Sequence, residues 1–220
     1  MKKTSQKPTM LIDFASFSPV SESFHTLRAN LDFIVAEKDM RVFTVTSAER
    51  GEGKSTAALN LAHAYARSGR KVLLIDSDFR SPSLHIALGI GLRDGLFNYL
   101  AGQVGLTEVI RETPHPCLQV MTSGALQSNP IELLTTEVMQ AFFLELKTRY
   151  DRVIVDVPPL LAAIEAQIVS GASDGAILVV ECRKTSRSQV EKAIKTLEHA
   201  RTPLLGAVMN KANRKPEYAY

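Results

Sequence analysis

The stretch from residue 42 to residue 66, VFTVTSAERGEGKSTAALNLAHAYA, constrains the fold of this chain more than any other. It begins with a β-branched run, passes through the turn Gly51-Glu52-Gly53, and continues into an alanine- and leucine-rich segment that favours a helix. This order of strand, loop and helix matches the phosphate-binding loop pattern, with Ala48 at the position of the usual first glycine. The stretch therefore predicts an α/β sheet with a nucleotide site where the strand meets the helix.

Each residue type in this loop has a role in holding a polyphosphate. The glycines let backbone N–H groups turn around phosphate oxygens, and the start of the helix adds its partial positive charge. Lys54 is expected to neutralise the β- and γ-phosphates, and Ser55 to offer its hydroxyl to Mg²⁺. We therefore expect ATP with Mg²⁺ to be bound by Gly51, Glu52, Gly53, Lys54, Ser55 and Thr56.

Length and composition limit the remaining possibilities. The 220 residues, 45% of them hydrophobic, suit one α/β domain with short appendages. A net charge of +3 is too small to indicate nucleic acid as a partner. The two cysteines, Cys117 and Cys182, are not spaced as metal ligands. Since the sequence shows no secretory signal and no run of about 18 apolar residues, we expect a cytoplasmic protein without a membrane span.

Short runs rich in Val, Ile and Leu recur along the chain and alternate with helical patterns. The runs lack polar alternation, which is typical of parallel strands covered on both faces. We expect strands over residues 42–46, 71–76, 118–122, 153–157, 176–180 and 205–209. Helices are expected over residues 21–37, 54–68, 94–101, 131–147, 165–170 and 186–199. This alternation predicts a doubly wound, mostly parallel sheet in a three-layer α/β/α arrangement of the P-loop type.

The two ends of the chain differ from the rest in composition. Residues 1–20 are polar and contain two prolines, so we expect an extended arm there. Residues 211–220, KANRKPEYAY, are expected to form a flexible tail. Residues 21–210 then form one domain, which opens with an amphipathic helix over residues 21–37. The apolar stripe of that helix fits packing on its own domain or against a neighbouring subunit.

Three aspartates stand at or just beyond the carboxyl ends of expected strands, where open α/β sheets bind their ligands. Asp76 ends the run LLID, Asp78 follows two residues later, and Asp156 lies in the run VIVD. One carboxylate at such a position can hold Mg²⁺, and a second one near the γ-phosphate can accept a proton from an attacking hydroxyl. A single aspartate there more often caps a turn or a helix. Two such strands downstream of a phosphate-binding loop favour the functional interpretation.

Taken together, the segments GEGKST, LLIDSDFRSP and VIVDVPP resemble the motifs of the bacterial tyrosine kinases, phosphate-loop autokinases of capsular and exopolysaccharide synthesis. Three further segments are similar to family features. SESFHTLRANLDF resembles the oligomerisation helix, TSGALQSNPIELL a Ser-Gly, Asn-Pro, Glu-Leu-Leu segment, and GAVMNK the strand whose final Asn contacts the base. The resemblance covers about residues 20–212 and implies that residues 21–210 form a P-loop kinase domain.

The resemblance implies a role for each matching residue. Lys54 would hold phosphate, and Asn210 would recognise adenine. Asp76 and Asp78 look like paired aspartates, of which one organises the metal and the other orients or deprotonates the tyrosine. The implied catalytic residues are Lys54, Asp76, Asp78 and Asp156, and the implied metal-organising residues are Ser55, Asp76 and Asp156.

The resemblance also implies how such a kinase assembles. In the family, subunits form rings in which the C-terminal tyrosines of one subunit enter the active site of the next. Tyr218 and Tyr220 are the matching acceptors here, although the family tail usually carries a larger tyrosine cluster. The implied partners are the cytoplasmic tail of a membrane activator (a polysaccharide co-polymerase), which recruits the kinase to the inner face of the membrane, and a cognate tyrosine phosphatase. No nucleic acid partner is implied.

The expected oligomerisation helix departs from the family at one position. The family places Glu, Arg and Arg at three-residue spacing, and the matching residues here are Glu22, His25 and Arg28. A histidine cannot replace a permanently charged guanidinium at neutral pH. We therefore expect ring assembly to be weakened or sensitive to pH.

The nearest alternative function is an ATPase switch of the kind that partitions DNA or positions division sites, as in ParA- and MinD-like proteins. Those relatives carry a signature lysine five residues before the loop lysine, a position that Glu49 occupies here, beside the basic residue Arg50. A tyrosine-bearing tail also has no role in such a switch. The sequence therefore favours the kinase.

A second alternative is a nucleotide-gated scaffold for the polysaccharide machinery with negligible turnover. The sequence retains the loop lysine, the loop serine and all three aspartates. A complete set of this kind argues against an inactive site.

Overall fold

The structure is a computed structural model that describes residues 18–212, so most of the expected N-terminal arm and C-terminal tail lies outside the described residues. The arm ends earlier than predicted, because helix α1 already begins at Pro19. Ser18 caps this helix by accepting a hydrogen bond from the backbone N–H of Ser21, and a proline fits the first helical position. None of the helices in the described range is long and apolar enough to cross a membrane.

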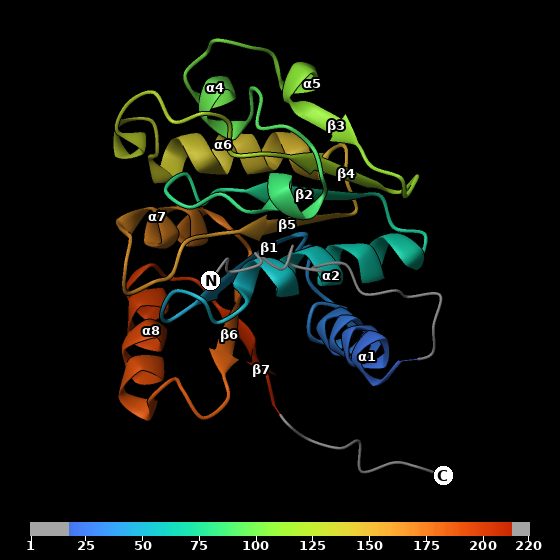
Figure 1. The fold of residues 1–220 in the computed structure, drawn as a ribbon, viewed down its shortest axis with the longest axis vertical. Helices are drawn as coiled ribbons and strands as arrows, with labels where there is room; N and C mark the ends of the chain where they lie inside the picture. The colour runs from blue at the N-terminus through green and yellow to red at the C-terminus, as the bar shows by residue number, and fades with distance from the viewer. Residues whose placement is uncertain (1–17, 213–220) are drawn as a thin grey trace, which may run out of the picture.

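A seven-stranded sheet runs through the centre of the fold in the order β3-β4-β2-β5-β1-β6-β7 (Figure 1). Its described pairings are parallel except at the edge, where β3 and β4 are antiparallel. The strands are β1 Val42–Ser47, β2 Val72–Asp76, β3 Ile110–Glu112, β4 Leu118–Met121, β5 Arg152–Asp156, β6 Gly175–Glu181 and β7 Leu204–Asn210. The doubly wound, mostly parallel sheet expected from the sequence is thereby confirmed.

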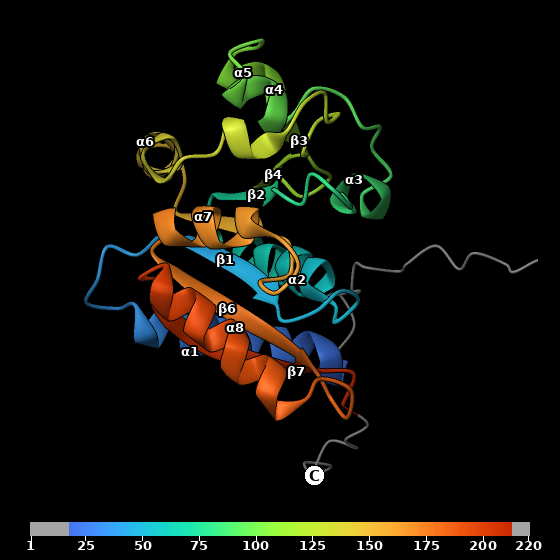
Figure 2. The ribbon, with the colours of Figure 1, turned by 90° about the vertical axis from the view of Figure 1, so that its left-hand side faces the viewer.

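Helices cover both faces of this sheet and give the fold its three layers (Figure 2). Helix α2 packs on the central strands of one face and is itself covered by α1, while α6, α7 and α8 lie on the opposite face. The helices are α1 Pro19–Ile34, α2 Lys54–Arg67, α3 Leu84–Ala87, α4 Leu96–Leu100, α5 Leu106–Val109, α6 Thr136–Lys147, α7 Ile164–Ala172 and α8 Arg187–His199.

Two hydrophobic cores, one on each face of the sheet, explain why the strand sequences lack polar alternation. In β2, Val72 and Leu74 pack toward α1 and α2, whereas Leu73 and Ile75 pack toward the helices of the other face. All four side chains are fully buried. Because successive side chains of a strand point to opposite faces, a strand covered on both sides is expected to be apolar along most of its length.

The structure divides one expected helix and adds three short elements. The pattern over residues 131–147 becomes a 3₁₀ turn at Pro130–Glu132 followed by α6. The break occurs because Thr135 caps α6 by accepting a hydrogen bond from the N–H of Val138. The sequence did not predict α3, α5 or β3, which are only three or four residues long. Segments this short carry too few residues for a periodic pattern.

Candidate functional site

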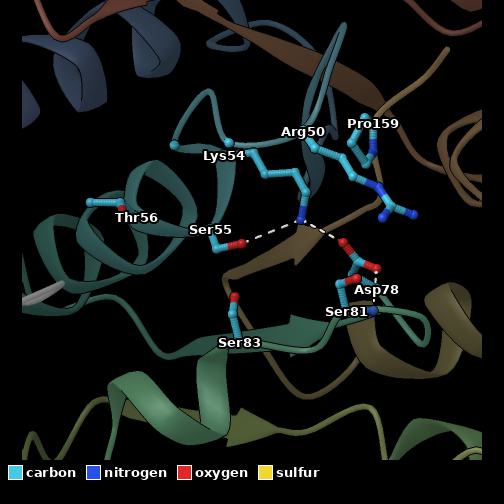
Figure 3. A pocket seen from close by; sticks show the side chains of 10 residues that line it. Arg50, Lys54, Ser55, Thr56, Asp78, Ser81, Ser83 and Pro159 are labelled. Carbon is cyan, nitrogen blue, oxygen red and sulfur yellow. Dashed lines mark hydrogen bonds and ion pairs between the residues drawn. The ribbon is translucent and has the colours of Figure 1, made fainter. Parts of the chain in front are cut away.

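The glycine loop joins β1 to α2 at the carboxyl edge of the parallel strands and forms one wall of a cavity of about 260 Å³ (Figure 3). Gly51 and Gly53 have φ values of 82° and 94°, in the left-handed region that favours glycine. The loop backbone can therefore curve without strain around a bound group. The cavity is lined by Arg50, Gly51, Gly53, Lys54, Ser55, Thr56, Asp78, Ser81, Ser83 and Pro159.

Lys54 lies at the centre of the polar contacts of this cavity. Its Nζ is 2.9 Å from a carboxylate oxygen of Asp78 and 3.2 Å from Oδ1 of Asp156, and it donates to the hydroxyl of Ser55 at 3.3 Å. Burial on its own lowers the pKa of Lys54, but the two carboxylates outweigh that effect and the pKa is raised. The ammonium group is therefore charged at neutral pH and is fixed between loop and carboxylates.

The surroundings of Asp156 fit a magnesium ion. Its Oδ2 atom is buried and has no hydrogen-bond partner among residues 18–212, although Oδ1 is paired with Lys54. Burial raises the pKa of Asp156, and the ammonium of Lys54 and the hydroxyl of Ser55 oppose that rise. The described residues contain no group of three or more His, Cys, Asp or Glu side chains able to hold a metal by themselves. Mg²⁺ takes few protein ligands and completes its shell with phosphates and water, so the unpartnered Oδ2 of Asp156 is the observation that fits it.

The paired aspartates after β2 have different surroundings. Asp78 lines the cavity and contacts Lys54. Asp76 instead accepts hydrogen bonds from three backbone N–H groups, those of Asp78 at 3.1 Å, Ser83 at 3.0 Å and Leu84 at 3.1 Å. Burial, followed by the charge of Asp156, raises the pKa of Asp76. In this structure Asp76 therefore shapes the loop that presents Asp78.

Two expected nucleotide-binding residues, Glu52 and Asn210, brace the glycine loop from behind. The carboxylate of Glu52 accepts the N–H groups of Ala48 and Glu49 at 3.0 and 3.3 Å. The Asn210 side-chain amide donates to the carbonyl of Glu52 at 2.8 Å. Neither side chain is among those that line the cavity, so adenine recognition by Asn210 stays a prediction.

The sequence did not indicate two other residues that support the loop. The hydroxyl of Thr185 donates to the Glu52 carboxylate from 133 positions further along the chain. The ammonium of Lys211 donates to the carbonyl of Gly51 at 2.9 Å and pairs with Glu181 at 3.1 Å. No local pattern marks these positions, since their role depends on where β6 and β7 end relative to β1.

Replacing Gly53 by alanine is expected to disrupt the loop more than its small volume suggests. An added Cβ would lie 2.0 Å from Nδ2 of Asn210, and φ is unfavourable for any side chain. Strain of about 1–3 kcal/mol localised here would weaken Mg·ATP binding by about 5- to 150-fold, measured by titration calorimetry. Gly69→Ala is a matched control, because φ is also positive there but no atom lies within 4 Å. Equal loss of affinity in both variants would contradict the prediction.

The expected oligomerisation residues lie on α1 with unequal exposure. Glu22 is exposed, whereas His25 and Arg28 are half-buried. Arg28 pairs with Asp32 of its own helix at 3.0 Å, so its guanidinium is engaged within the subunit. His25 is one of the groups that lower the pKa of His63 to about 4, after burial and the nearby His115 and Arg67. Assembly through these residues stays a prediction, and the tail tyrosines lie outside the described residues.

Comparison with known proteins agrees with this geometry. Residues 40–208 match a family described as AAA domain. The tyrosine-protein kinase YwqD of Bacillus subtilis is 40% identical over 202 residues, which cover 91% of this chain and 85% of the relative. The kinase domain of Escherichia coli tyrosine kinase ETK superposes with a TM-score of 0.86 at 30% identity and covers 100% of this chain and 88% of that one.

Two further solved structures separate the kinase from the ATPase switch. The chimerical protein CapA2B2 has a TM-score of 0.87 at 32% identity and covers 94% of this chain and 91% of its own. The septum site-determining protein MinD of Pyrococcus horikoshii, complexed with Mg-ADP, has a TM-score of 0.69 at 26% identity, over 80% of this chain and 72% of its own. The switch proteins are thus more distant relatives, and the chain belongs to the bacterial tyrosine-protein kinases.

Proposed function

We propose that this kinase transfers the γ-phosphoryl group of ATP to Tyr218 and Tyr220 in the tail of a neighbouring copy and so regulates capsular or exopolysaccharide synthesis and export. The observation that carries the proposal is the position of Lys54, held between Asp78 and Asp156 in the cavity that the glycine loop lines. The relatives named as tyrosine-protein kinases support the reaction type.

In the proposed reaction, a bond forms between the γ-phosphorus and the phenolic oxygen while the bond to the β–γ bridging oxygen breaks. ADP leaves with the electron pair, and the phenolic proton passes to a carboxylate. We propose that Asp78 accepts this proton, because it lines the cavity. The carboxylate of Asp76 instead accepts hydrogen bonds from three backbone N–H groups. Lys54 neutralises charge on the phosphates. When bound, Mg²⁺ supplies further charge neutralisation. Ser55 and Asp156 would hold it directly or through water, and Asp76 would help to organise the metal from outside the cavity lining.

The proposed partners follow from the relatives and the tail. The chimerical protein CapA2B2 fits a kinase that works joined to a second protein, here the cytoplasmic tail of a membrane activator that recruits the kinase to the membrane. Phosphorylated tyrosines gain negative charge and would leave a site already walled by carboxylates, which loosens a ring of subunits. A cognate phosphatase would restore the unmodified tail.

A mixing experiment tests both the tail tyrosines as phosphoryl acceptors and the transfer of the phosphoryl group between copies. Tyr218→Phe/Tyr220→Phe keeps the active site but lacks the proposed acceptors, and Lys54→Met keeps the tail but lacks the loop lysine. We expect neither variant to label alone, and the mixture to label only the tail of Lys54→Met, as detected by mass spectrometry of the C-terminal peptide.

Internal tyrosines provide the control for that experiment. Tyr65 and Tyr150 are buried, whereas Tyr99 is half-buried and is therefore the most exposed tyrosine of the described region. Tyr99→Phe should label as fully as the parent protein. Labelling that disappears in Tyr99→Phe, or a mixture without label on the Lys54→Met tail, would contradict transfer to the neighbouring tail.

A further inference from the structure

Arg50 is the second cation that lines the nucleotide cavity, and neither the phosphate-loop pattern nor the resemblance gives it a role. Its side chain is exposed and makes no hydrogen bond or ion pair with any residue from 18 to 212. Figure 3 shows its side chain extending from the glycine loop beside Pro159, with the guanidinium on the side of Asp78. A guanidinium that lines a phosphate site and has no partner among the described residues is able to bind the phosphates of the ligand.

The base of this side chain is held more firmly than its tip. The carbonyl of Glu49 accepts a hydrogen bond from the Ser47 hydroxyl at 2.7 Å, and the Glu49 carboxylate accepts one from Gln189 at 3.4 Å. On its other side, Gly51 is held through its carbonyl by Lys211. The backbone on both sides of Arg50 is thus anchored, while the guanidinium is free to turn onto a bound group.

Without the charge of Arg50, the side chains around Lys54 give the cavity more negative than positive charge. Lys54 is shared between the carboxylates of Asp78 and Asp156, so one ammonium faces two negative groups. These carboxylates repel an approaching polyphosphate, and the three equatorial oxygens of the transferred group still carry charge in the transition state. A planar guanidinium can bind two phosphate oxygens at once, which an ammonium cannot do.

We propose that Arg50 is a catalytic residue that binds the γ-phosphoryl oxygens within its own subunit and stabilises them during transfer. The proposal rests on the phosphoryl transfer described above but not on which tyrosine accepts the group. It accounts for a basic side chain at a position that the loop pattern leaves open. Arg50 should therefore contribute more to the transition state than to the binding of ADP.

The test compares the affinity for Mg·ADP with that for Mg·ADP plus aluminium fluoride, which mimics the group in transfer. The parent protein should bind the fluoride complex more tightly. Arg50→Ala should lose about 10²-fold of that preference while its Kd for Mg·ADP changes by less than about threefold. Arg50→Lys, which keeps the charge but not the fork, should fall between the two. Arg149→Ala, an exposed arginine paired with Glu145 on α6, should behave as the parent.

The outcomes distinguish a failure of the role proposed for Arg50 from a failure of the tail tyrosines as phosphoryl acceptors. An unchanged preference in Arg50→Ala, an equal loss of affinity for Mg·ADP, or a parent protein without any preference for the fluoride complex would overturn the role of Arg50. Loss of preference in Arg50→Ala alongside a parent protein that labels no tail tyrosine would support Arg50 and count against the tail as substrate.

Discussion

Replacing Lys54 by methionine is expected to lower the initial rate of tyrosine phosphorylation by about 10³-fold or more, because its ammonium is the buried cation of the nucleotide cavity. Methionine keeps most of the apolar stem but leaves Asp78 and Asp156 facing each other without a counter-charge. The phosphates of ATP then lose their contact with the ammonium and meet two carboxylates whose negative charge is no longer balanced.

The rate is measured with γ-labelled ATP, and thermal unfolding confirms that the variant is folded. Lys195→Met is the matched control, since this lysine is exposed on α8 and makes no contact with the cavity. It should keep the rate of the parent protein. Full tyrosine labelling by folded Lys54→Met would refute the role assigned to the loop lysine.

Replacing Asp156 by asparagine is expected to lower the rate by about 10²–10³-fold and to raise the Mg²⁺ concentration needed for half of the maximal rate by about tenfold. Asparagine has nearly the same size, but its amide cannot supply the charge of the unpartnered Oδ2 atom. In the described part of the chain, Asp78 is then the one charged carboxylate paired with Lys54, so binding of metal-free nucleotide should be unchanged or tighter.

The shift in Mg²⁺ dependence separates a metal-organising role from simple damage to the fold. Asp94→Asn, at an exposed position before α4, should leave both the rate and the Mg²⁺ dependence unchanged. If Asp156→Asn loses rate without any change in Mg²⁺ dependence, Asp156 supports Lys54 and does not organise the metal.

Most of the fold could be predicted from the sequence because the strands are buried on both faces. Runs such as 72–75 are apolar at every position, and that pattern is visible without a structure. The antiparallel edge of the sheet was less predictable. Strand β3 has only three residues, is partly exposed and pairs with β4 in the antiparallel sense. Its formation depends on β4 as a partner, which local pattern does not report.

The centre of the site was predictable for a different reason. Lys54 follows a loop with its own signature. Asp78 follows β2 and Asp156 ends β5, two neighbouring strands whose carboxyl ends lie beside that loop. Backbone contacts were not predictable: the N–H groups that hold Asp76, and the contact between Asn210 and Glu52, follow from loop geometry. The sequence indicated that Lys54, Asp78 and Asp156 lie together, but not that Asp76 and Asn210 make contacts outside the cavity lining.

Binding of Mg·ATP between the glycine loop and the carboxylates of Asp78 and Asp156 can be measured by titration calorimetry on the purified chain. We expect a single site with a Kd within about 1 µM–1 mM, the range typical of enzyme substrates, and strongly weakened binding in Lys54→Met. A correctly folded chain that takes up no Mg·ATP at millimolar concentration, or that binds it equally well without Lys54, would contradict the account.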